Sequence, residues 1–109
     1  MSTFPIDLNI LVNSPGVDSI SGREFGATFA ERQDLLAHVR NQDKIVLYID
    51  ETRVKAINDS FIKGFFKSVF ELLRSKRKVQ DQFEIKASDY YKRLFDKNWT
   101  ILEAIYASA

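Results

Sequence analysis

The order of apolar and polar positions predicts a strand, a loop and a helix in the middle of the chain. Residues 45–49 are all apolar or aromatic and end at Asp50, which is typical of a strand buried on both faces of a sheet. After a polar loop, residues 58–60 supply side chains that can cap a helix, and an apolar stripe at helical spacing predicts a helix over residues 60–76. Polar groups therefore gather at the carboxyl end of a central strand, where α/β sheets usually receive ligands and partners.

The segments on either side of this unit predict further strands and helices. Residues 6–12 nearly alternate between apolar and polar, as in a half-buried strand, and residues 17–20 are compatible with a short return strand. Helical spacing predicts a helix over residues 22–40 and another from residue 89, with a strand at residues 82–87 before it. The order β(β)αβαβα predicts an α/β fold, a small mixed sheet of about four strands with helices mainly on one face.

Two glycines lie inside predicted helices. Gly26 costs about 1 kcal/mol relative to alanine in a helix, so either the helix begins later or a neighbouring backbone comes close. Gly64 precedes an aromatic pair, and its missing side chain lets another main chain or a partner approach. Close packing against the sheet is the simpler explanation of Gly64.

Composition favours one globular domain over residues 1–109. The chain has 45% hydrophobic and 28% charged residues, and its net charge of +1 does not predict nucleic-acid binding. There is no cysteine, which excludes disulfides, thiolate metal sites and cysteine nucleophiles. No apolar run approaches the roughly 18 to 20 residues of a membrane span, and the amino terminus lacks the basic start of a secretion signal. We therefore expect a cytoplasmic protein that does not enter a membrane.

Motifs for catalysis are missing from the sequence. There is no G-x-S-x-G, the four glycines make neither common phosphate-binding loop, and we expect the single histidine, His38, to have a surface or capping role. Asp50, Glu51 and Asp59 could gather at one edge of the sheet and bind a divalent cation, although capping alone explains acids at strand ends and helix starts. We expect no enzyme activity, no cofactor and no metal.

Three sequence features suggest a family. Gly22 and Arg23 open the first helix with Phe25 soon after, and the hydrophobic strand closes with Asp50. The third feature leads into the helix that contains Gly64, and it reads Val54-x-x-Ile57-Asn58-Asp59-Ser60-Phe61. Over residues 21–75 the chain resembles the STAS fold of sulphate transporters and anti-sigma factor antagonists, and more closely the prokaryotic STAS-like family of unassigned function. The resemblance implies a non-catalytic regulatory module that binds a histidine-kinase-type ATPase.

The resemblance also bears on Ser60. In anti-sigma factor antagonists the corresponding loop reads Asp-Ser-Ser/Thr-Gly, and a kinase phosphorylates the second hydroxyl. In one register Asp59 matches the acid and Ser60 the first hydroxyl, with Phe61 at the phosphorylated position. In the other register Ser60 stands at the acceptor position, while Asn58 replaces the acid. Ser60 is therefore a candidate phosphorylation site, and the alternative is that Ser60 or Asp59 simply caps a helix.

An exposed loop beside a helix start is a suitable docking surface for a partner protein. The predicted partner-binding residues are Arg53, Lys55, Asn58, Asp59, Ser60 and Lys63.

The alternative function is anion or nucleic-acid binding by the basic cluster at residues 74–78, which contains Arg74, Lys76, Arg77 and Lys78. No aromatic residues are interleaved with these charges, which disfavours binding of a single strand. Cations at a helix end also meet the negative end of the helix dipole, so a solvated helix end explains them as well. The aromatic content of 13% is consistent with a hydrophobic core, and a homodimer face that contains some of these residues is an alternative.

Overall fold

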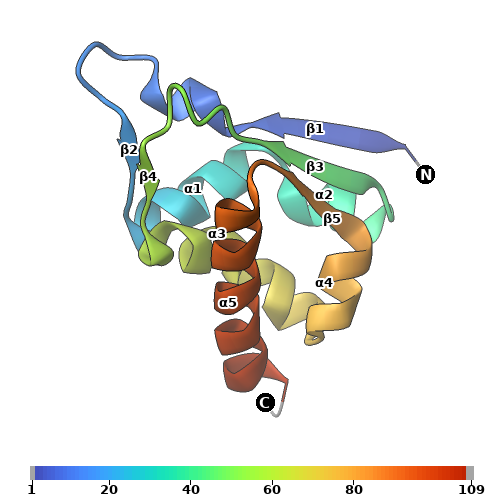
Figure 1. Ribbon diagram of the computed structural model, residues 1–109. Helices are drawn as coiled ribbons and strands as arrows, with labels where there is room; N and C mark the ends of the chain where they lie inside the picture. Colours follow the sequence, from blue (N-terminus) through green and yellow to red (C-terminus); the bar gives the residue numbers. More distant parts are fainter. Residues whose placement is uncertain (1, 108–109) are drawn as a thin grey trace.

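A computed structural model describes residues 2–107 of the protein, which form an α/β fold (Figure 1). Three strands make a parallel sheet in the order β1-β3-β5, namely β1 (Thr3–Asp7), β3 (Lys44–Tyr48) and β5 (Phe83–Lys86). Two short strands, β2 (Ser19–Ile20) and β4 (Ala56–Ile57), pair in parallel as a second sheet. The helical segments are η1 (Leu8–Val12), α1 (Arg23–Arg32), α2 (Leu35–Arg40), α3 (Asp59–Leu73), α4 (Lys76–Gln82) and α5 (Asp89–Tyr106).

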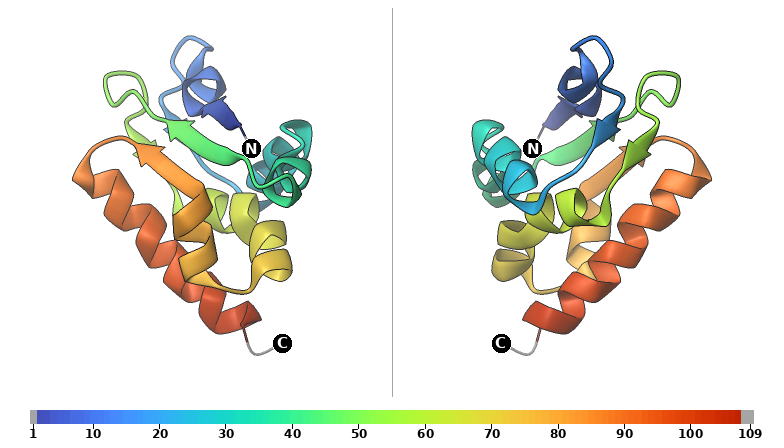
Figure 2. Two further views of the ribbon diagram at one scale, coloured as in Figure 1. Left: turned by 90° about the vertical axis from the view of Figure 1, so that its right-hand side faces the viewer. Right: turned by 90° about the vertical axis from the view of Figure 1, so that its left-hand side faces the viewer.

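The predicted central strand is confirmed, but only one of its faces packs on the core. Ile45 and Leu47 of β3 are fully buried in the hydrophobic cluster, and the helices lie mainly on one side of the three-stranded sheet (Figure 2). Val46 and Tyr48 lie on the other face, where Tyr48 is 42% exposed and Val46, although buried, is outside that cluster. The expectation of burial on both faces therefore holds for Val46 but not for Tyr48, since an apolar run does not reveal which face a helix covers. β1, with Pro5 at its centre, is an edge strand.

The amino-terminal half differs from the prediction in three ways. The sheet is parallel and not mixed, because segments that contain helices carry the chain from β1 back to the start of β3 and from β3 back to the start of β5. The predicted strand at residues 6–12 ends at Asp7, whose carboxylate accepts a hydrogen bond from the Asn9 main-chain N–H at 2.9 Å and starts η1. β2 does not return along β1, since its only partner among residues 2–107 is β4.

Two predicted helices are each divided by a residue in the left-handed conformation. The helix expected over residues 22–40 is interrupted at Asp34, which has φ of 52° and separates α1 from α2. The helix expected over residues 60–76 ends at Leu73, because Arg74 has φ of 57° and Ser75 then caps α4. The residues 76–78 therefore open α4 instead of closing α3, which corrects the expected position of the basic cluster.

Helices α1 and α3 cross with their main chains in contact. A Cβ atom on Gly26 would lie 2.3 Å from the carbonyl oxygen of Phe61, and one on Gly64 would lie 1.9 Å from that of Arg23. These distances confirm that a neighbouring backbone approaches both glycines. Gly64 packs against α1, so its expected packing against the sheet was wrong.

Helix α3 is the centre of the hydrophobic core. Its Phe66 packs edge to face on Phe83 of β5 and on Phe95 and Trp99 of α5, with ring centroids 5.0, 6.1 and 5.4 Å apart. Such aromatic pairs add to the stabilisation that comes from burial. α5 runs unbroken from Asp89 to Tyr106, and no helix among residues 2–107 is long and apolar enough to cross a membrane.

The crossing of α1 and α3 predicts that Gly64→Ala destabilises the protein. The new methyl group would overlap the main chain of Arg23, and we expect the free energy of unfolding to fall by about 1 to 3 kcal/mol, even though alanine favours the helix by about 1 kcal/mol. Urea unfolding followed by circular dichroism measures this change. Ser68→Ala, at an exposed position of α3, is the control, and a Gly64→Ala protein as stable as wild type would contradict the prediction.

Candidate functional site at the start of helix α3

The loop that follows β3 is fixed at the carboxyl end of the sheet. The main-chain N–H of Asp50 donates to Oδ1 of the buried Asn9 at 2.7 Å, which links the ends of β3 and β1. The Asp50 carboxylate accepts hydrogen bonds from the hydroxyl and the main-chain N–H of Thr52, at 2.7 and 2.9 Å. Both hydrogen bonds lower the pKa of Asp50, and the bond from the hydroxyl has the larger effect. The loop therefore starts in a closed turn.

Two of the predicted docking residues hold this loop to the amino-terminal segment. The guanidinium of Arg53 donates to the Asn9 carbonyl oxygen at 3.3 Å and to Oδ1 of Asn13. The main-chain N–H of Lys55 donates to the carbonyl oxygen of Asp18 at 2.7 Å, just before the pairing of β2 with β4. Arg53 is thus engaged within the protein, whereas the side chain of Lys55 is exposed.

The opposite side of the loop is held by α5. The Glu51 carboxylate accepts hydrogen bonds from the Ser88 main-chain N–H at 2.9 Å and from the Ser88 hydroxyl at 2.7 Å. The hydroxyl of Tyr91 donates to the carbonyl oxygen of Val54 at 3.4 Å, and burial raises the pKa of Tyr91. The loop is consequently anchored to η1 and β2 on one side and to α5 on the other.

The starts of α1 and α3 meet at the hydroxyl group of Ser60. Asn58 is the N-cap of α3, and its Oδ1 accepts hydrogen bonds from the main-chain N–H and the hydroxyl of Ser60, at 2.8 and 2.7 Å. The Ser60 Oγ in turn accepts a hydrogen bond from the Gly22 main-chain N–H at 3.2 Å. Asn58 therefore has the capping role that was considered for Ser60 or Asp59, and half-buried Ser60 connects the two helices.

Asp59 is tied to the last helix. Its carboxylate lies 2.9 Å from the ammonium group of Lys97 on α5, and this hydrogen bond is the main reason why the pKa of Asp59 is lowered. The positive charge of Lys63, one turn further along α3, acts in the same direction. Asp59 and Lys63, which the sequence predicted as partner-binding residues, thus lie close together. Lys97, which the sequence did not predict, lies beside them.

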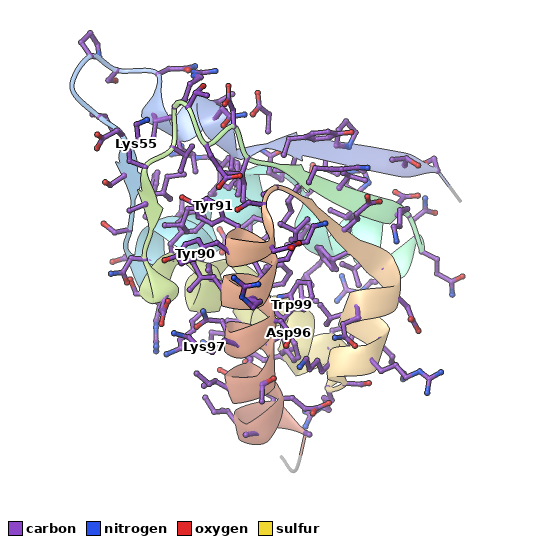
Figure 3. All side chains as sticks on the ribbon, viewed as in Figure 1. Lys55, Tyr90, Tyr91, Asp96, Lys97 and Trp99 are labelled. Atoms are coloured by element: carbon purple, nitrogen blue, oxygen red, sulfur yellow. The ribbon has the colours of Figure 1, made fainter. Side chains whose placement is uncertain are left out.

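Two exposed aromatic residues lie on the helices that flank the start of α3. Phe25 on α1 is 42% exposed and its ring centroid lies 5.8 Å from that of Phe61, while Tyr90 on α5 is 62% exposed. Figure 3 shows Lys55, Tyr90 and Lys97 on the side of α5 that faces β4 and α3. The sequence singled out Phe25 only for the family resemblance and not as a docking residue. The sequence offered one sign that Tyr90 is exposed, because Tyr90 lies outside the apolar stripe that contains its neighbour Tyr91.

The acids considered for a divalent cation have separate partners. Asp50 binds Thr52, Glu51 binds Ser88 and Asp59 binds Lys97. Within residues 2–107, no group of three histidine, aspartate or glutamate residues could hold a metal ion.

The basic cluster at residues 74–78 is partly engaged in the structure. The Arg74 guanidinium donates to the carbonyl oxygen of Tyr106 at 3.2 Å. The Lys76 ammonium group donates to Asp96 at 2.9 Å and to the hydroxyl of Thr100 at 2.7 Å. An anion-binding role for this cluster would therefore depend mainly on the exposed Arg77 and Lys78.

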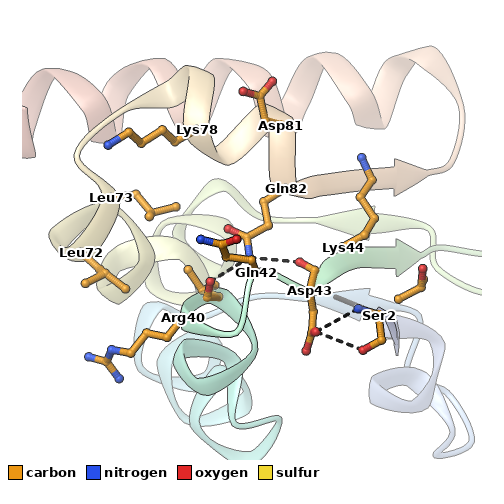
Figure 4. Close-up of a pocket in the computed structure, with 12 residues that line it drawn as sticks. Ser2, Arg40, Gln42, Asp43, Lys44, Leu72, Leu73, Lys78, Asp81 and Gln82 are labelled. Atoms are coloured by element: carbon orange, nitrogen blue, oxygen red, sulfur yellow. Dashed lines mark hydrogen bonds between the residues drawn. The ribbon is translucent and has the colours of Figure 1, made fainter.

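A large surface cavity lies at the other end of the sheet. Its volume is about 810 Å³, and it opens at the amino ends of β1 and β3 (Figure 4). Arg40 and Lys78 lie on either side of two leucines of α3, but Asp43 and Asp81 also line the cavity. The C-terminal ends of α2 and α3 add negative partial charge there. This mixture of charges selects no ligand.

Asp43, beside this cavity, holds the start of β1. Its buried carboxylate accepts hydrogen bonds from the main-chain N–H and the hydroxyl of Ser2, at 3.3 and 3.0 Å, and from the Asn41 amide at 2.8 Å. His38 Nδ1 lies 2.7 Å away, and the His38 ring stacks on Phe4. The bond from His38 is the main reason why the pKa of Asp43 falls to about 2. His38 therefore has a structural role.

We expect Asn58→Ala to destabilise the protein, because the mutation leaves the Ser60 main-chain N–H without its cap. The expected loss is about 1 kcal/mol in the free energy of unfolding. Asn58→Asp keeps an oxygen in the capping position and should remain near wild type. Chemical denaturation of the three proteins measures the effect, and equal loss in the alanine and aspartate proteins would show that the cap is not its cause.

The pKa of Asp43 predicts a contribution to acid stability. Because the folded pKa of about 2 lies below the usual aspartate pKa of 3.8, ionised Asp43 stabilises the fold above about pH 4, and this contribution is lost as the pH falls toward 2. Asp43→Asn should lower the thermal midpoint at pH 7 and flatten its pH dependence between pH 4 and 2. A constant difference from wild type across that range would contradict the assignment.

The chain was also compared with known proteins. A scan against protein-family models and searches of curated proteins and of solved structures found no match. The function proposed below therefore rests on the residues and the geometry of the chain itself.

Proposed function

We propose that the chain is a STAS-like, non-catalytic regulatory module that docks a partner protein through the loop and helix start at residues 53–63. The partner is a histidine-kinase-type ATPase or a protein of similar architecture. The observation that carries this proposal is the anchoring of the loop, which is hydrogen-bonded to Asn9, Asp18 and Ser88 from different directions. A surface fixed in this way loses little conformational entropy when a partner binds.

The arrangement of elements supports the comparison with STAS domains. A parallel central strand runs into a loop and then into α3, whose start lies beside the start of α1, and the helices cover one face of the sheet. Over residues 21–75 the chain thus passes from α1 and α2 through β3 and the loop into α3. The short parallel pair of β2 and β4 guides both helix starts to the same place.

The surface around the start of α3 has the composition of a docking site. Exposed Phe25 and Tyr90 supply apolar area on the two flanking helices, and aromatic residues are frequent among the residues that dominate binding. Lys55 and Lys63 add positive charge between these two aromatic residues, while Lys97 balances the charge of Asp59. A partner with acidic groups at the edge of its interface would complement this surface.

Phosphorylation of Ser60 would provide a way to control the docking. A phosphate on its Oγ would add about −1.5 to −2 charges where the amino ends of α1 and α3 meet, and helix amino ends stabilise anions. The same phosphate would replace the hydroxyl that now donates to Asn58. The modification would thus change both the charge and the hydrogen bonding of the docking surface.

Binding to a histidine-kinase-type ATPase encoded by a neighbouring gene tests the proposal. We expect a complex in isothermal titration calorimetry, and Lys55→Glu with Lys63→Glu should weaken it at least about tenfold through charge reversal at the interface. The control is Lys67→Glu, which reverses one charge on α3 about one turn beyond Lys63. Absence of a complex, or a double variant that binds as tightly as Lys67→Glu, would refute the docking surface.

A phosphate-transfer assay tests the control step separately. With labelled ATP and the same ATPase, wild-type protein should incorporate phosphate and Ser60→Ala should not. Incorporation that persists in Ser60→Ala would place the acceptor elsewhere. Binding without any incorporation would leave the docking role intact and remove Ser60 as its switch.

A further inference from the structure

Three helices enclose a small apolar pocket on the side of α3 that faces α1 and α2. Its volume is about 200 Å³, of the order of one large apolar side chain. The residues that line it are small or apolar apart from two acids at the rim, and they are Ala27, Ala30, Glu31, Asp34, Leu35, Leu36, Ala37, Gly64, Phe65 and Ser68. The pocket is a preformed hole in the surface.

The pocket follows from two features of the fold. The contact of α1 and α3 at Gly64 brings these helices together, and the left-handed conformation of Asp34 then turns the chain into α2. Between the contact and the turn, alanine side chains from α1 and α2 and Ser68 from α3 are too short to fill the space. The buried rings of Phe65 and Phe29 fix α3 against α1, with centroids 6.0 Å apart.

The rim of the pocket is negatively charged. Glu31 and Asp34 are its only charged lining residues, and no ion pair among residues 2–107 neutralises either of them. The C-terminal end of α1 and the amino end of α2 both lie at this rim, and because their partial charges have opposite sign, the two carboxylates set its charge. An occupant that carries positive charge beside an apolar group would therefore be complementary.

We propose that this pocket binds a basic segment of a partner protein, which inserts one aliphatic or aromatic side chain and places lysine or arginine residues beside Glu31 and Asp34. The pocket lies along the α1–α3 seam, and Ser68 is two helical turns, about 12 Å, beyond Ser60. Its lining on α3 begins at Gly64, directly after the docking surface at residues 53–63, so the two surfaces adjoin but share no residue. The two surfaces also differ in charge, since the docking surface suits an acidic partner and the pocket a basic one.

The probe for this pocket is the amidated peptide Lys-Arg-Lys-Leu-Lys-Arg-Lys. Titrated into isotopically labelled protein, it should shift the amide resonances of Ala30, Ala37 and Gly64, with a dissociation constant on the order of 1 mM or below. The same peptide with serine in place of leucine should bind at least about tenfold more weakly, because it buries no apolar side chain. A peptide with glutamate at every basic position should cause no shifts there.

Matched variants locate the binding site. Ser68→Leu should fill the pocket and weaken binding of the leucine peptide at least about tenfold, while Ser68→Ala leaves the pocket open and should bind like wild type. Glu31→Gln combined with Asp34→Asn removes the charges at unchanged size and should weaken binding about threefold to tenfold. Glu24→Gln, on the same helix outside the pocket, is the control for charge. Thermal unfolding confirms that each variant is folded.

Several outcomes would overturn the proposal. These are an absence of shifts at peptide concentrations of about 1 mM, equal binding of the serine or glutamate peptides, and binding that survives Ser68→Leu. Shifts confined to Ser60 and Lys63 would assign the peptide to the docking surface instead. Self-association that Ser68→Leu abolishes, in the absence of any peptide, would show that the pocket serves a second copy of the chain.

Discussion

The direct contact between the main chains of α1 and α3 is the constraint on which the rest of this structure depends. Gly26 and Gly64 allow it, because any side chain at either position would collide with the backbone of the other helix. The contact sets α3 as the centre of the core, and it brings the Gly22 N–H to the Ser60 hydroxyl. Further along the same seam, it also produces the pocket bordered by Asp34. A docking surface and a pocket thus share one structural origin.

A second level of organisation consists of polar groups that act where the hydrophobic core does not reach. Asn9, Glu51 and Asp43 each use one side chain to join segments that are about 40 residues apart in the sequence. The loop after β3 is held mainly in this way, since most of its residues are exposed. Hydrogen bonds that involve a charged group stabilise a protein more than hydrogen bonds between neutral groups. Each of these three side chains fixes only the segments that it joins. The hydrogen bonds that hold the loop in position are therefore distinct from the hydrophobic contacts that stabilise the fold.

The sequence predicts those parts of the fold that depend on local patterns. α3 and α5 were found because their apolar positions repeat at the period of a helix, and β3 because residues 45–49 form an unbroken apolar run. The ends of α1 and α3 were missed, since Asp34 and Arg74 adopt a left-handed conformation that no glycine announces. Asn58 and Ser60 could be identified from capping preferences alone. The links of Ser60 to Gly22 and of Asp59 to Lys97 could not, because they join residues 38 positions apart and leave no local pattern.

The composition of β1 has a consequence for the behaviour of the protein at high concentration. An outermost strand offers unpaired main-chain groups to other molecules, and this is a common route to aggregation. Pro5 has no amide hydrogen, so a foreign strand cannot form an uninterrupted ladder along β1. The charged pair Glu84 and Lys86, 2.8 Å apart on β5, discourages the same growth at the opposite margin. Both borders of this three-stranded sheet thus resist polymerisation.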